Sequence, residues 1–496
     1  MEANVSTRTI KSAECYEERK LSRALMGGTK EMIKRGTDFT PQYPGETHES
    51  YKARLQGTTL YNAFEDTIKK SAGKVLSKDI VLEDDVPSVI VEQSKNIDGQ
   101  GRNLTAFTLD ALKEALVDGI SYIFIDFTKV IRQDEAGQPT GEEPFLSDQI
   151  NSGARPNAIL YTGDQLLGVK HENIDGNEKL TEIRFHECIV EPIGLWGEVS
   201  REQVRVQRIG SYELWRKEDE SKDEWFLFEA GPNSLEAIPV VPVYTNRTGF
   251  MFGLPPLKSL AELNLEHWIS SSEQRKSLVF ARFAMMVFAG VEPGSITSVG
   301  PDQIITLRDP EASWGKVEGA GAGLEHGRLD LEAIKKNMET AGLTIQVQNL
   351  SGDVTATAAS LNSEDANAAL LAIAGGLEDS IDQVLQFFAD YQSLGKGGTS
   401  SINKQFGRKL STATVTDFIG LYNSGLLDDK TILTELQKRG DISEDLKIDE
   451  VLAQVKENMP TLLGELDLTA KEKEVDNIGK DEEAAKGGNP FAKGKK

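Results

Sequence analysis

The chain has little cysteine, little histidine and no long apolar stretch. Its 496 residues include only two cysteines, Cys15 and Cys188, so a disulfide scaffold is excluded and a reducing compartment is the expected setting. No run of about 18 apolar residues occurs, so we expect no membrane span. The N-terminal residues also lack the apolar core of a signal peptide. These absences together predict a chain that folds in the cytoplasm.

Basic residues are also in deficit. The sequence has 55 Lys and Arg against 79 Asp and Glu, which gives a formal net charge of −24. Tight or sequence-specific binding of nucleic acid needs Lys and Arg to displace the counterions of the phosphates, so this charge argues against it. A surface past which DNA slides without sticking is still compatible with the composition.

The motifs of common enzymes are missing. No GxGxxG and no GxxxxGK[ST] lies at a strand-to-helix junction, which excludes the usual dinucleotide and nucleoside triphosphate sites. His186 and Cys188 lie two apart on a predicted strand and so share a face, but two ligands are too few for structural zinc. We interpret them as a half-buried histidine and an inert core cysteine. We predict no catalytic residue, cofactor or metal.

What the sequence does contain is a polar loop that leads into a long helix, over residues 346–392. From Ser363 onward, apolar residues recur at steps of three or four and so share one helical face. They are Leu370, Ile373, Leu377, Ile381, Val384 and Phe388. Gly375 and Gly376 interrupt the middle of this helix, which indicates either a bend or a close approach of another backbone.

The N-terminal half predicts helices and a small sheet. A helix is expected over residues 47–76, and a second over 104–118 that stops at Gly119 and is followed by a buried strand to Phe127. Further strands, separated by turns such as Asp175-Gly176, predict a small mixed or antiparallel sheet. These strands cover residues 158–160, 180–190, 203–214, 225–229 and 240–244.

Two long helices then flank an insertion rich in glycine and proline. Pro255 opens a helical pattern that continues to Phe283, and helical periodicity returns over residues 328–344. Between them, residues 291–324 predict short strands. Near the C-terminus, residues 414–442 predict a helix, a turn at Gly425, a cap at Asp428 or Asp429 and a second helix that ends at Gly440.

Several short segments resemble one group of tailed-bacteriophage portal proteins, a group often known only as a phage domain of unknown function. The N-terminal ones are MGGTKEM at 26–32, QYPGE at 42–46, YKARL at 51–55 and LYNAFEDTIKKSAGKV at 60–75. The order of sheet domain, helix, β insertion, helix, polar loop and long helix also resembles the portal order of wing, stem, clip, stem, tunnel loop and wing helix. The resemblance covers residues from about 26 to 460.

The resemblance implies an α+β portal fold with these parts. They are an N-terminal arm at 1–45, a wing at 46–254, stem helix 1 at 255–283, a clip at 284–326, stem helix 2 at 327–345, a tunnel loop at 346–362, a long kinked wing helix at 363–393 and a helical crown at 394–468. Residues 469–496 mix charges of both signs with few apolar side chains, and we predict a disordered tail.

The resemblance also implies a function that needs no catalysis. Portal proteins form a ring, usually of twelve subunits, at one vertex of the capsid, and they are head-to-tail connectors through which double-stranded DNA is packaged and ejected. The expected partners are other copies of the chain, DNA held without sequence specificity, the terminase large subunit, head-completion or adaptor proteins, scaffold and the major capsid protein. The expected location is the capsid portal vertex of the virion, after assembly in the host cytoplasm.

The resemblance assigns roles to three sets of residues. The tunnel loop would present Gln348, Asn349, Leu350, Ser351, Asp353, Thr355 and Thr357 to DNA. Its amides and hydroxyls can bond phosphate without the affinity of lysines, while Asp353 is its one charge and would repel DNA. The stem would place Arg275, Lys276, Lys335 and Lys336 at the channel. The clip would present Glu292, Arg308 and Trp314 to terminase. Gly375 and Gly376 would be the helix kink.

Other interpretations stay open at this stage. The four stem cations could instead lie on a solvated helix face or form salt bridges between subunits with Glu262, Glu266, Glu332 or Glu339, and Trp314 could be local core. The chain could be another structural head or adaptor protein of a phage. An uncharacterised enzyme built from the dispersed acids Asp118, Asp126 and Glu187 is a further alternative, with no spacing in its favour.

Overall fold

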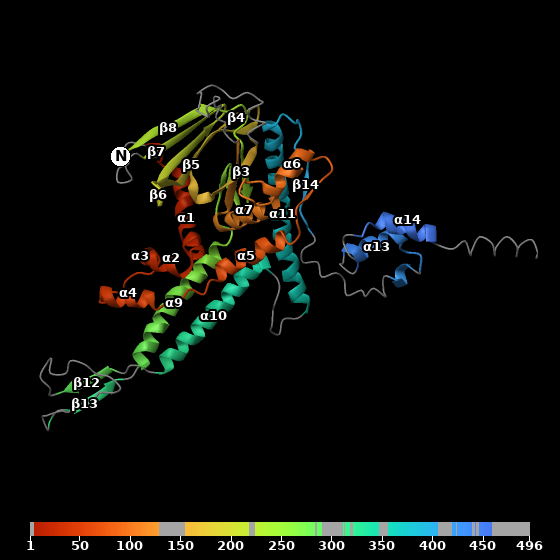
Figure 1. The fold of residues 1–496 in the computed structure, drawn as a ribbon. Helices are drawn as coiled ribbons and strands as arrows, with labels where there is room; N and C mark the ends of the chain where they lie inside the picture. Colours follow the sequence, from red (N-terminus) through yellow and green to blue (C-terminus); the bar gives the residue numbers. More distant parts are fainter. Residues whose placement is uncertain are drawn as a thin grey trace, which may run out of the picture. The chain divides into compact units, whose positions relative to one another are not determined.

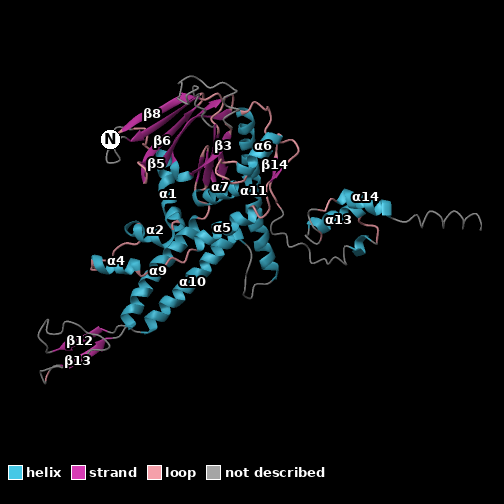
Figure 2. Ribbon diagram, viewed as in Figure 1, coloured by secondary structure: helices cyan, strands magenta, loops and turns pink. Residues whose placement is uncertain are grey.

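A computed structural model describes residues 4–127, 154–217, 224–282, 285–289, 311, 313–317, 321–346, 356–404, 419–422, 424–438, 442 and 446–458. The chain divides into two compact units, Met1–Gly407 and Arg408–Lys496. Helices and strands are segregated along the chain, which confirms the predicted α+β class (Figures 1 and 2). Among the described residues, no helix is both long enough and apolar enough to cross a membrane.

The N-terminal region is a set of short helices. They are α1 (Ile10–Met26), α2 (Gly28–Lys34), α3 (Gly36–Phe39), α4 (His48–Gln56) and α5 (Ala63–Val75). The prediction of a single helix over residues 47–76 is therefore wrong. Gly57 ends α4, and the Asn62 side chain accepts a hydrogen bond from the Glu65 N–H at 3.2 Å and so starts α5. Two local caps outweigh the continuous apolar pattern.

Helix α1, which lies within the predicted N-terminal arm, is firmly anchored to the rest of the first unit. Arg19 is 1% exposed and donates hydrogen bonds to three backbone carbonyls, those of Asp118 at 3.0 Å, Gly253 at 2.8 Å and Gly163. The sequence pattern missed this anchor because all three acceptors are main-chain atoms from distant segments.

Helix α7 (Leu104–Asp118) leads into a three-stranded antiparallel sheet in the order β3-β2-β9. Its strands are β2 (Ile120–Phe127), β3 (Pro156–Thr162) and β9 (Val240–Tyr244). Gly119 ends α7 with φ of 84°, as predicted, and a Cβ there would collide with the Leu254 backbone. Short elements complete this region: β1 (Val81–Leu82), paired with β14 (Ser400–Ser401), α6 (Ser88–Gln93) and the 3-10 turns η1 (Ser94–Asn96) and η2 (Gly163–Gln165).

A second sheet is an antiparallel meander of five strands. Its strands are β4 (Leu166–Ile174), β5 (Asn177–Ile193), β6 (Gly197–Arg208), β7 (Ser211–Lys217) and β8 (Trp225–Pro232). The turn at Asp175-Gly176 is confirmed, since both residues have positive φ. The single strand expected over 203–214 is wrong because Gly210, at φ of 74°, turns the chain between β6 and β7. Strand β4 was not predicted. A small hairpin follows, β10 (Arg247–Gly249) with β11 (Phe252–Gly253).

The helix-insertion-helix segment has the predicted order. Helix α9 (Lys258–Arg282) precedes an antiparallel strand pair, β12 (Met285–Ala289) with β13 (Ser313–Val317), and α10 (Gly321–Gln346) follows. Helix α11 (Ala356–Tyr391) begins seven residues before its predicted start. The alanines of its first turns favour a helix there, so residues 356–362 are helical and not part of a loop.

Helix α11 is a central packing element of the first unit. Its predicted apolar face is buried, with Leu370, Leu377, Ile381, Val384 and Phe388 at most 1% exposed. Figure 1 shows α11 alongside the three-stranded sheet and α7, and the core there joins α5, α7 and α10 to β2 and β9. The long helix therefore holds one end of the α9–α10 pair and the sheet in one core.

The second unit contains a helical turn at 419–422, α13 (Asp429–Lys438) and α14 (Ile448–Asn458). The predicted turn at Gly425 is confirmed by its φ of 73°. Lys430 Nζ lies 2.7 Å from Asp449 Oδ1, and Gln437 Nε2 donates to the Leu446 carbonyl at 2.9 Å, so the two helices pack together. The predicted helix end at Gly440 and the tail 469–496 lie outside the described residues.

Candidate functional site

The helices α9 and α10 form an antiparallel pair that lies side by side in Figure 1. Ser270 Oγ donates to Asp330 Oδ2 at 2.8 Å, and nearer the strand pair Gln274 Nε2 donates to the Leu324 carbonyl at 2.8 Å. A Cβ at Gly327 would collide with the Gln274 side chain, so glycine allows the close approach. The pair is thus held by polar contacts along its length and leads into β12 and β13.

The start of α9 is fixed on the N-terminal helices by buried polar contacts. The Asn264 amide accepts a hydrogen bond from the Phe64 N–H at 3.0 Å and donates to the Tyr61 carbonyl at 2.9 Å. One turn later, Trp268 is fully buried and its Nε1 donates to Thr40 Oγ1 at 2.9 Å. These contacts set the direction in which the helix pair leaves the core.

An ion cluster ties the segment before α4 to the middle of α9. The Glu46 carboxylate accepts from Arg54 Nη2 at 2.9 Å and lies 3.0 Å from Lys276 Nζ. Arg54 also donates to Ser272 Oγ at 3.1 Å. The hydrogen bonds from Arg54 lead the causes that lower the pKa of Glu46 to about 2, so its carboxylate is ionised at neutral pH. This cluster braces one flank of the helix pair.

On another flank of the pair, a hollow of about 540 Å³ runs between α9 and α10. Leu278, Leu324 and Leu331 supply apolar lining, and Arg275 and Lys335 add positive charge. His267 also lines the hollow and is 4% exposed, yet neither ring nitrogen has a hydrogen-bond partner among the described residues. Burial, followed by the charge of Lys335, lowers the pKa of His267, so its ring is neutral near pH 7.

The predicted stem cations have different surroundings. Lys276 belongs to the Glu46 cluster within one chain, so its predicted partners in neighbouring subunits are not needed to explain it. Lys335 Nζ lies 5.0 Å above the Tyr61 ring, and Lys336 is exposed. Arg275 is exposed and lines two hollows. That any of them faces a channel stays a prediction.

Most of the predicted loop and clip residues lie outside the described residues. These are Gln348, Asn349, Leu350, Ser351, Asp353, Thr355, Glu292 and Arg308. Thr357 lies on α11, so its assignment to a loop is wrong. Trp314 lies on β13, where its backbone is paired in register with Phe288.

The glycine pair of α11 has room around it. A Cβ on Gly375 or Gly376 would meet no atom within 4 Å, so the close backbone approach considered as an alternative is wrong. The Ser380 hydroxyl bonds back to the Gly376 carbonyl at 2.9 Å and to the Pro242 carbonyl at 3.1 Å. Such back-bonding often accompanies helix bending, and the bend itself stays a prediction.

The dispersed acids of the enzyme alternative have structural partners. Asp118 is completely buried against the Arg23 guanidinium. Asp126 and Glu187 do come together, because Arg205 lies 3.5 Å from Asp126 Oδ2 and donates to Glu187 Oε1 at 2.6 Å. This ion bridge joins the two sheets. The sequence could not indicate it, since the residues lie on β2, β5 and β6.

The His186 and Cys188 pair forms no metal site. His186 Nε2 lies 3.9 Å from Glu202, and Cys188 Sγ lies 2.8 Å from Ser200 Oγ. No group of three potential ligands occurs in the part of the chain that the structure describes. The interpretation of Cys188 as core is wrong, because this half of β5 extends beyond the core and Cys188 is exposed.

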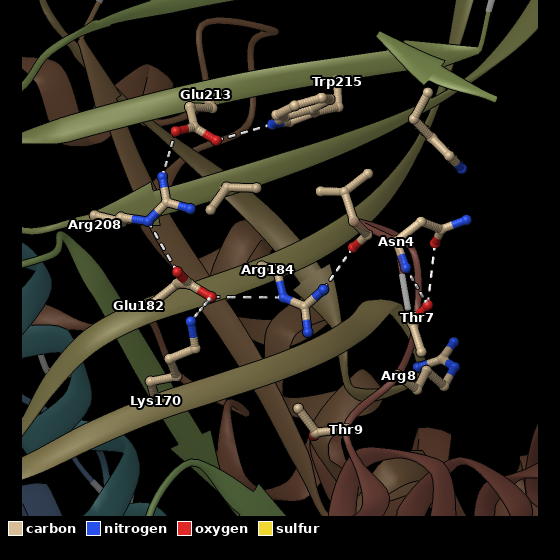
Figure 3. A pocket seen from close by; sticks show the side chains of 13 residues that line it. Asn4, Thr7, Arg8, Thr9, Lys170, Glu182, Arg184, Arg208, Glu213 and Trp215 are labelled. Carbon is tan, nitrogen blue, oxygen red and sulfur yellow. Dashed lines mark hydrogen bonds and ion pairs between the residues drawn. The ribbon is translucent and has the colours of Figure 1, made fainter. Parts of the chain in front are cut away.

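A hollow of about 670 Å³ on the five-stranded sheet was not predicted (Figure 3). Residues 4–9 run along its rim. Figure 3 shows Lys170 and Arg208 pointing at Glu182 from two sides, at 3.1 Å and 2.9 Å, while Glu213 links Arg208 to Trp215. Arg184 donates to the Val5 carbonyl at 2.6 Å, and its burial lowers the pKa of its guanidinium. The hollow was missed because β4, which carries Lys170, ends in a polar run without alternation.

Comparison with known proteins adds these similarities. Residues 256–392, from just before α9 to the end of α11, match the model of a domain of unknown function (DUF4055). The chain also resembles a chain from the neck of an empty gene transfer agent (GTA) particle, computed with C6 symmetry, with a TM-score of 0.40 and 11% identity over 82% of this chain and 93% of that chain. It resembles a chain from the neck of a native GTA particle, computed with C12 symmetry, with a TM-score of 0.38 and 13% identity over 82% of this chain and 98% of that chain. A third similar chain is from the virion of a native GTA particle, with a TM-score of 0.37 and 10% identity over 81% of this chain and 97% of that chain. No curated protein matches by sequence.

Proposed function

We propose that this chain is a portal protein, which forms the ring at one vertex of a phage or phage-like capsid through which DNA is packaged and ejected. The observation that carries the proposal is the continuous order of α9, the β12–β13 pair, α10, residues 347–355 and α11. In this assignment α9 and α10 are the stem, the strand pair belongs to the clip, residues 347–355 form the tunnel loop and α11 is the wing helix.

The physical properties of the segment support these roles. Two antiparallel helices braced by polar contacts make a stiff spacer that can hold the strand pair away from the core. The loop follows α10 and precedes α11, whose later turns are buried in the core, so both of its ends are attached to packed helices. The net charge of −24 disfavours tight binding of a duplex, as a channel that DNA must traverse requires.

The proposal assigns no chemistry to the chain. Terminase would supply the energy of packaging and dock at the clip, while head-completion or adaptor proteins would bind after the capsid is filled. Scaffold and the major capsid protein are the proposed neighbours during assembly. Asp118, Asp126 and Glu187 are accounted for by internal ion pairs, so they carry no argument for an enzyme.

The decisive experiment is the assembly state of the purified full chain. Native mass spectrometry and negative-stain microscopy should show closed rings, twelve subunits being the expected number, with a central hole near the width of a duplex. A chain that stays monomeric at all concentrations would overturn the proposal. Closed rings without a hole would instead favour another structural head or adaptor protein.

A further inference from the structure

The hairpin of β5 and β6 ends in an exposed apolar tip. The tip comprises residues Ile193–Gly197, where Gly194 has φ of 63° and allows a tight turn. Leu195 is 88% exposed and Trp196 is 96% exposed. Exposed tryptophans of this kind recur at the centres of protein interfaces, where they supply a large share of the binding energy. The tip therefore has the character of an interface anchor.

The tip itself has no charged residue, and the strand ends beside it carry acids and no base. Residues 189–200 contain two carboxylates, Glu191 and Glu198, and no Lys or Arg. Glu191 is held by Arg201 at 3.0 Å and by Arg216 at 2.8 Å. Glu198 forms no ion pair within the described ranges. A surface that receives the tip should therefore combine apolar and basic side chains.

The hollow of Figure 3 has that combination. Four basic residues line it, Arg8, Lys170, Arg184 and Arg208, against two acids, Glu182 and Glu213. Its apolar lining includes Trp215, Trp225 and Val206. A net positive hollow stands out on a chain whose charge is −24. Its positive charge complements Glu198 beside the tip, and its aromatic lining complements Leu195 and Trp196.

The tip of a chain cannot reach the hollow of the same chain. Glu182 and Arg184 of the hollow lie on β5, and nine residues separate Arg184 from Ile193. At about 3.3 Å per residue this is about 30 Å of extended strand. Strands β5 and β6 stay paired from Glu182↔Arg208 to Ile193↔Gly197, so the hairpin does not fold back. A tip can occupy this hollow only when it comes from another molecule.

We propose that the hairpin tip of one copy inserts into the hollow of the neighbouring copy, with Trp196 as the anchor. Two different surfaces on one chain then make a head-to-tail contact, which is the type of interface that closes a ring. The inference rests on the proposed ring and assigns one of its subunit contacts. The basic hollow also gives an acidic chain a local attraction that offsets the repulsion between copies.

The experiment pairs two introduced cysteines in a Cys188→Ser background, since Cys188 is exposed and Cys15 is buried. Leu195→Cys lies on the tip and Thr7→Cys on the rim of the hollow. Under an added oxidant, the double variant should give a ladder of disulfide-linked oligomers on a non-reducing gel, and neither single variant should. Leu195→Cys combined with Glu49→Cys on α4 is the matched control and should give no ladder.

A second variant tests the anchor without any crosslink. Trp196→Asp should weaken the contact between copies by about thirtyfold or more and leave folded chains outside rings, with unchanged circular dichroism. Leu426→Asp changes another exposed apolar residue, 72% exposed, and should leave rings intact.

The outcomes separate this inference from the proposed function. If the wild-type chain forms no ring, the proposed function fails and this inference fails with it. If rings form but persist in Trp196→Asp, or if intact rings give no Leu195–Thr7 crosslink, the inference is overturned and the proposed function stands. A product limited to dimers linked through two tips would also overturn it.

Discussion

Glu46 and Arg54 form an ion pair at 2.9 Å whose side chains are 2% and 1% exposed. The same carboxylate lies 3.0 Å from Lys276 on α9, so one buried acid joins the segment before α4 to the helix pair. A buried charge that loses its partner is strongly destabilised, because the solvation that it gave up is no longer compensated. The stability of this joint should therefore depend on Glu46 and on its ionisation.

Glu46→Gln should lower the free energy of unfolding by about 3–5 kcal/mol at pH 7, because Arg54 would stay buried without its counter-charge. Urea unfolding followed by circular dichroism measures the change. Glu49→Gln, three residues further on in the first turn of α4, is the matched control and should change stability by less than about 0.5 kcal/mol. A loss of similar size in both variants would contradict the role of Glu46.

The same pair predicts a pH dependence. The pKa of Glu46 is lowered to about 2 in the folded chain, from 4.5, so its contribution is fully present above pH 4.5. The contribution is lost as the pH falls from 4.5 toward 2, because the unfolded chain takes up the proton first. Over that range the wild-type chain should lose more stability than Glu46→Gln. Parallel acid profiles would contradict the assignment.

Arg19 should be among the most sensitive positions outside the apolar core. Arg19→Met keeps most of the volume but leaves the carbonyls of Asp118, Gly163 and Gly253 without their donor. Each unsatisfied buried acceptor costs about 1–3 kcal/mol, so a loss of at least about 3 kcal/mol is expected in thermal or urea unfolding. Lys20→Met, on the exposed side of α1, is the control. A loss below about 1 kcal/mol would show that water replaces the guanidinium.

The sequence predicted those features that depend on periodicity and on caps. The order of α9, strand pair, α10 and α11 was predictable because apolar residues recur at helical spacing. The end of α7 was predictable from Gly119 alone. The roles of Arg19 and Arg205 were not predictable, because their partners are distant carbonyls and acids on other strands. Strand β4 was missed because its second half, from Lys170, is a polar sheet edge.

The exposed tip also shows where sequence reasoning stops. Leu195 and Trp196 are apolar, and their type alone favours burial. Only the register of β5 with β6 shows that they lie at the end of a hairpin, beyond any packing partner in the described chain. Likewise, residues from all five strands of the sheet and from the segment 4–9 line the hollow, so its charge could not be assigned before the strand order was known.

His267 predicts a second pH dependence, of a different kind. Its folded pKa is lowered from 6.5 by burial, so the unfolded chain binds the proton first and stability should fall as the pH drops below about 6.5. His267→Leu removes a buried polar ring that has no hydrogen-bond partner among the described residues, so it should remove this slope and leave stability at pH 7 unchanged or about 1 kcal/mol higher. His326→Leu, at an exposed position of α10, is the control. A marked loss of stability at pH 7 would contradict this expectation.

Variants of Gly375 and Gly376 on α11 test stability and function separately. Gly375→Ala and Gly376→Ala should each stabilise the chain by up to about 1 kcal/mol, because a methyl group meets no atom within 4 Å and alanine favours helix. Gly73→Ala on α5 has the same free space and serves as control. If the bend positions the loop, the double alanine variant should form normal rings but package less DNA. Normal packaging by a stabilised double variant would remove the kink from the mechanism.

The loop prediction is the most direct test of contact with DNA. Deletion of residues 349–355 should leave rings intact, since both flanking helices are held by other contacts, and should reduce DNA packaging or retention. A second variant, in which the same residues are replaced by Gly and Ser, keeps the length of the connection. It controls for misfolding that the shorter connection of the deletion variant could cause. Rings are checked by negative-stain microscopy, and packaging by the DNA that particles protect from nuclease. If both variants package and retain DNA as the wild-type chain does, residues 349–355 do not act on DNA. The constriction must then be sought on α9 and α10, where Arg275 and Lys336 are among the exposed cations.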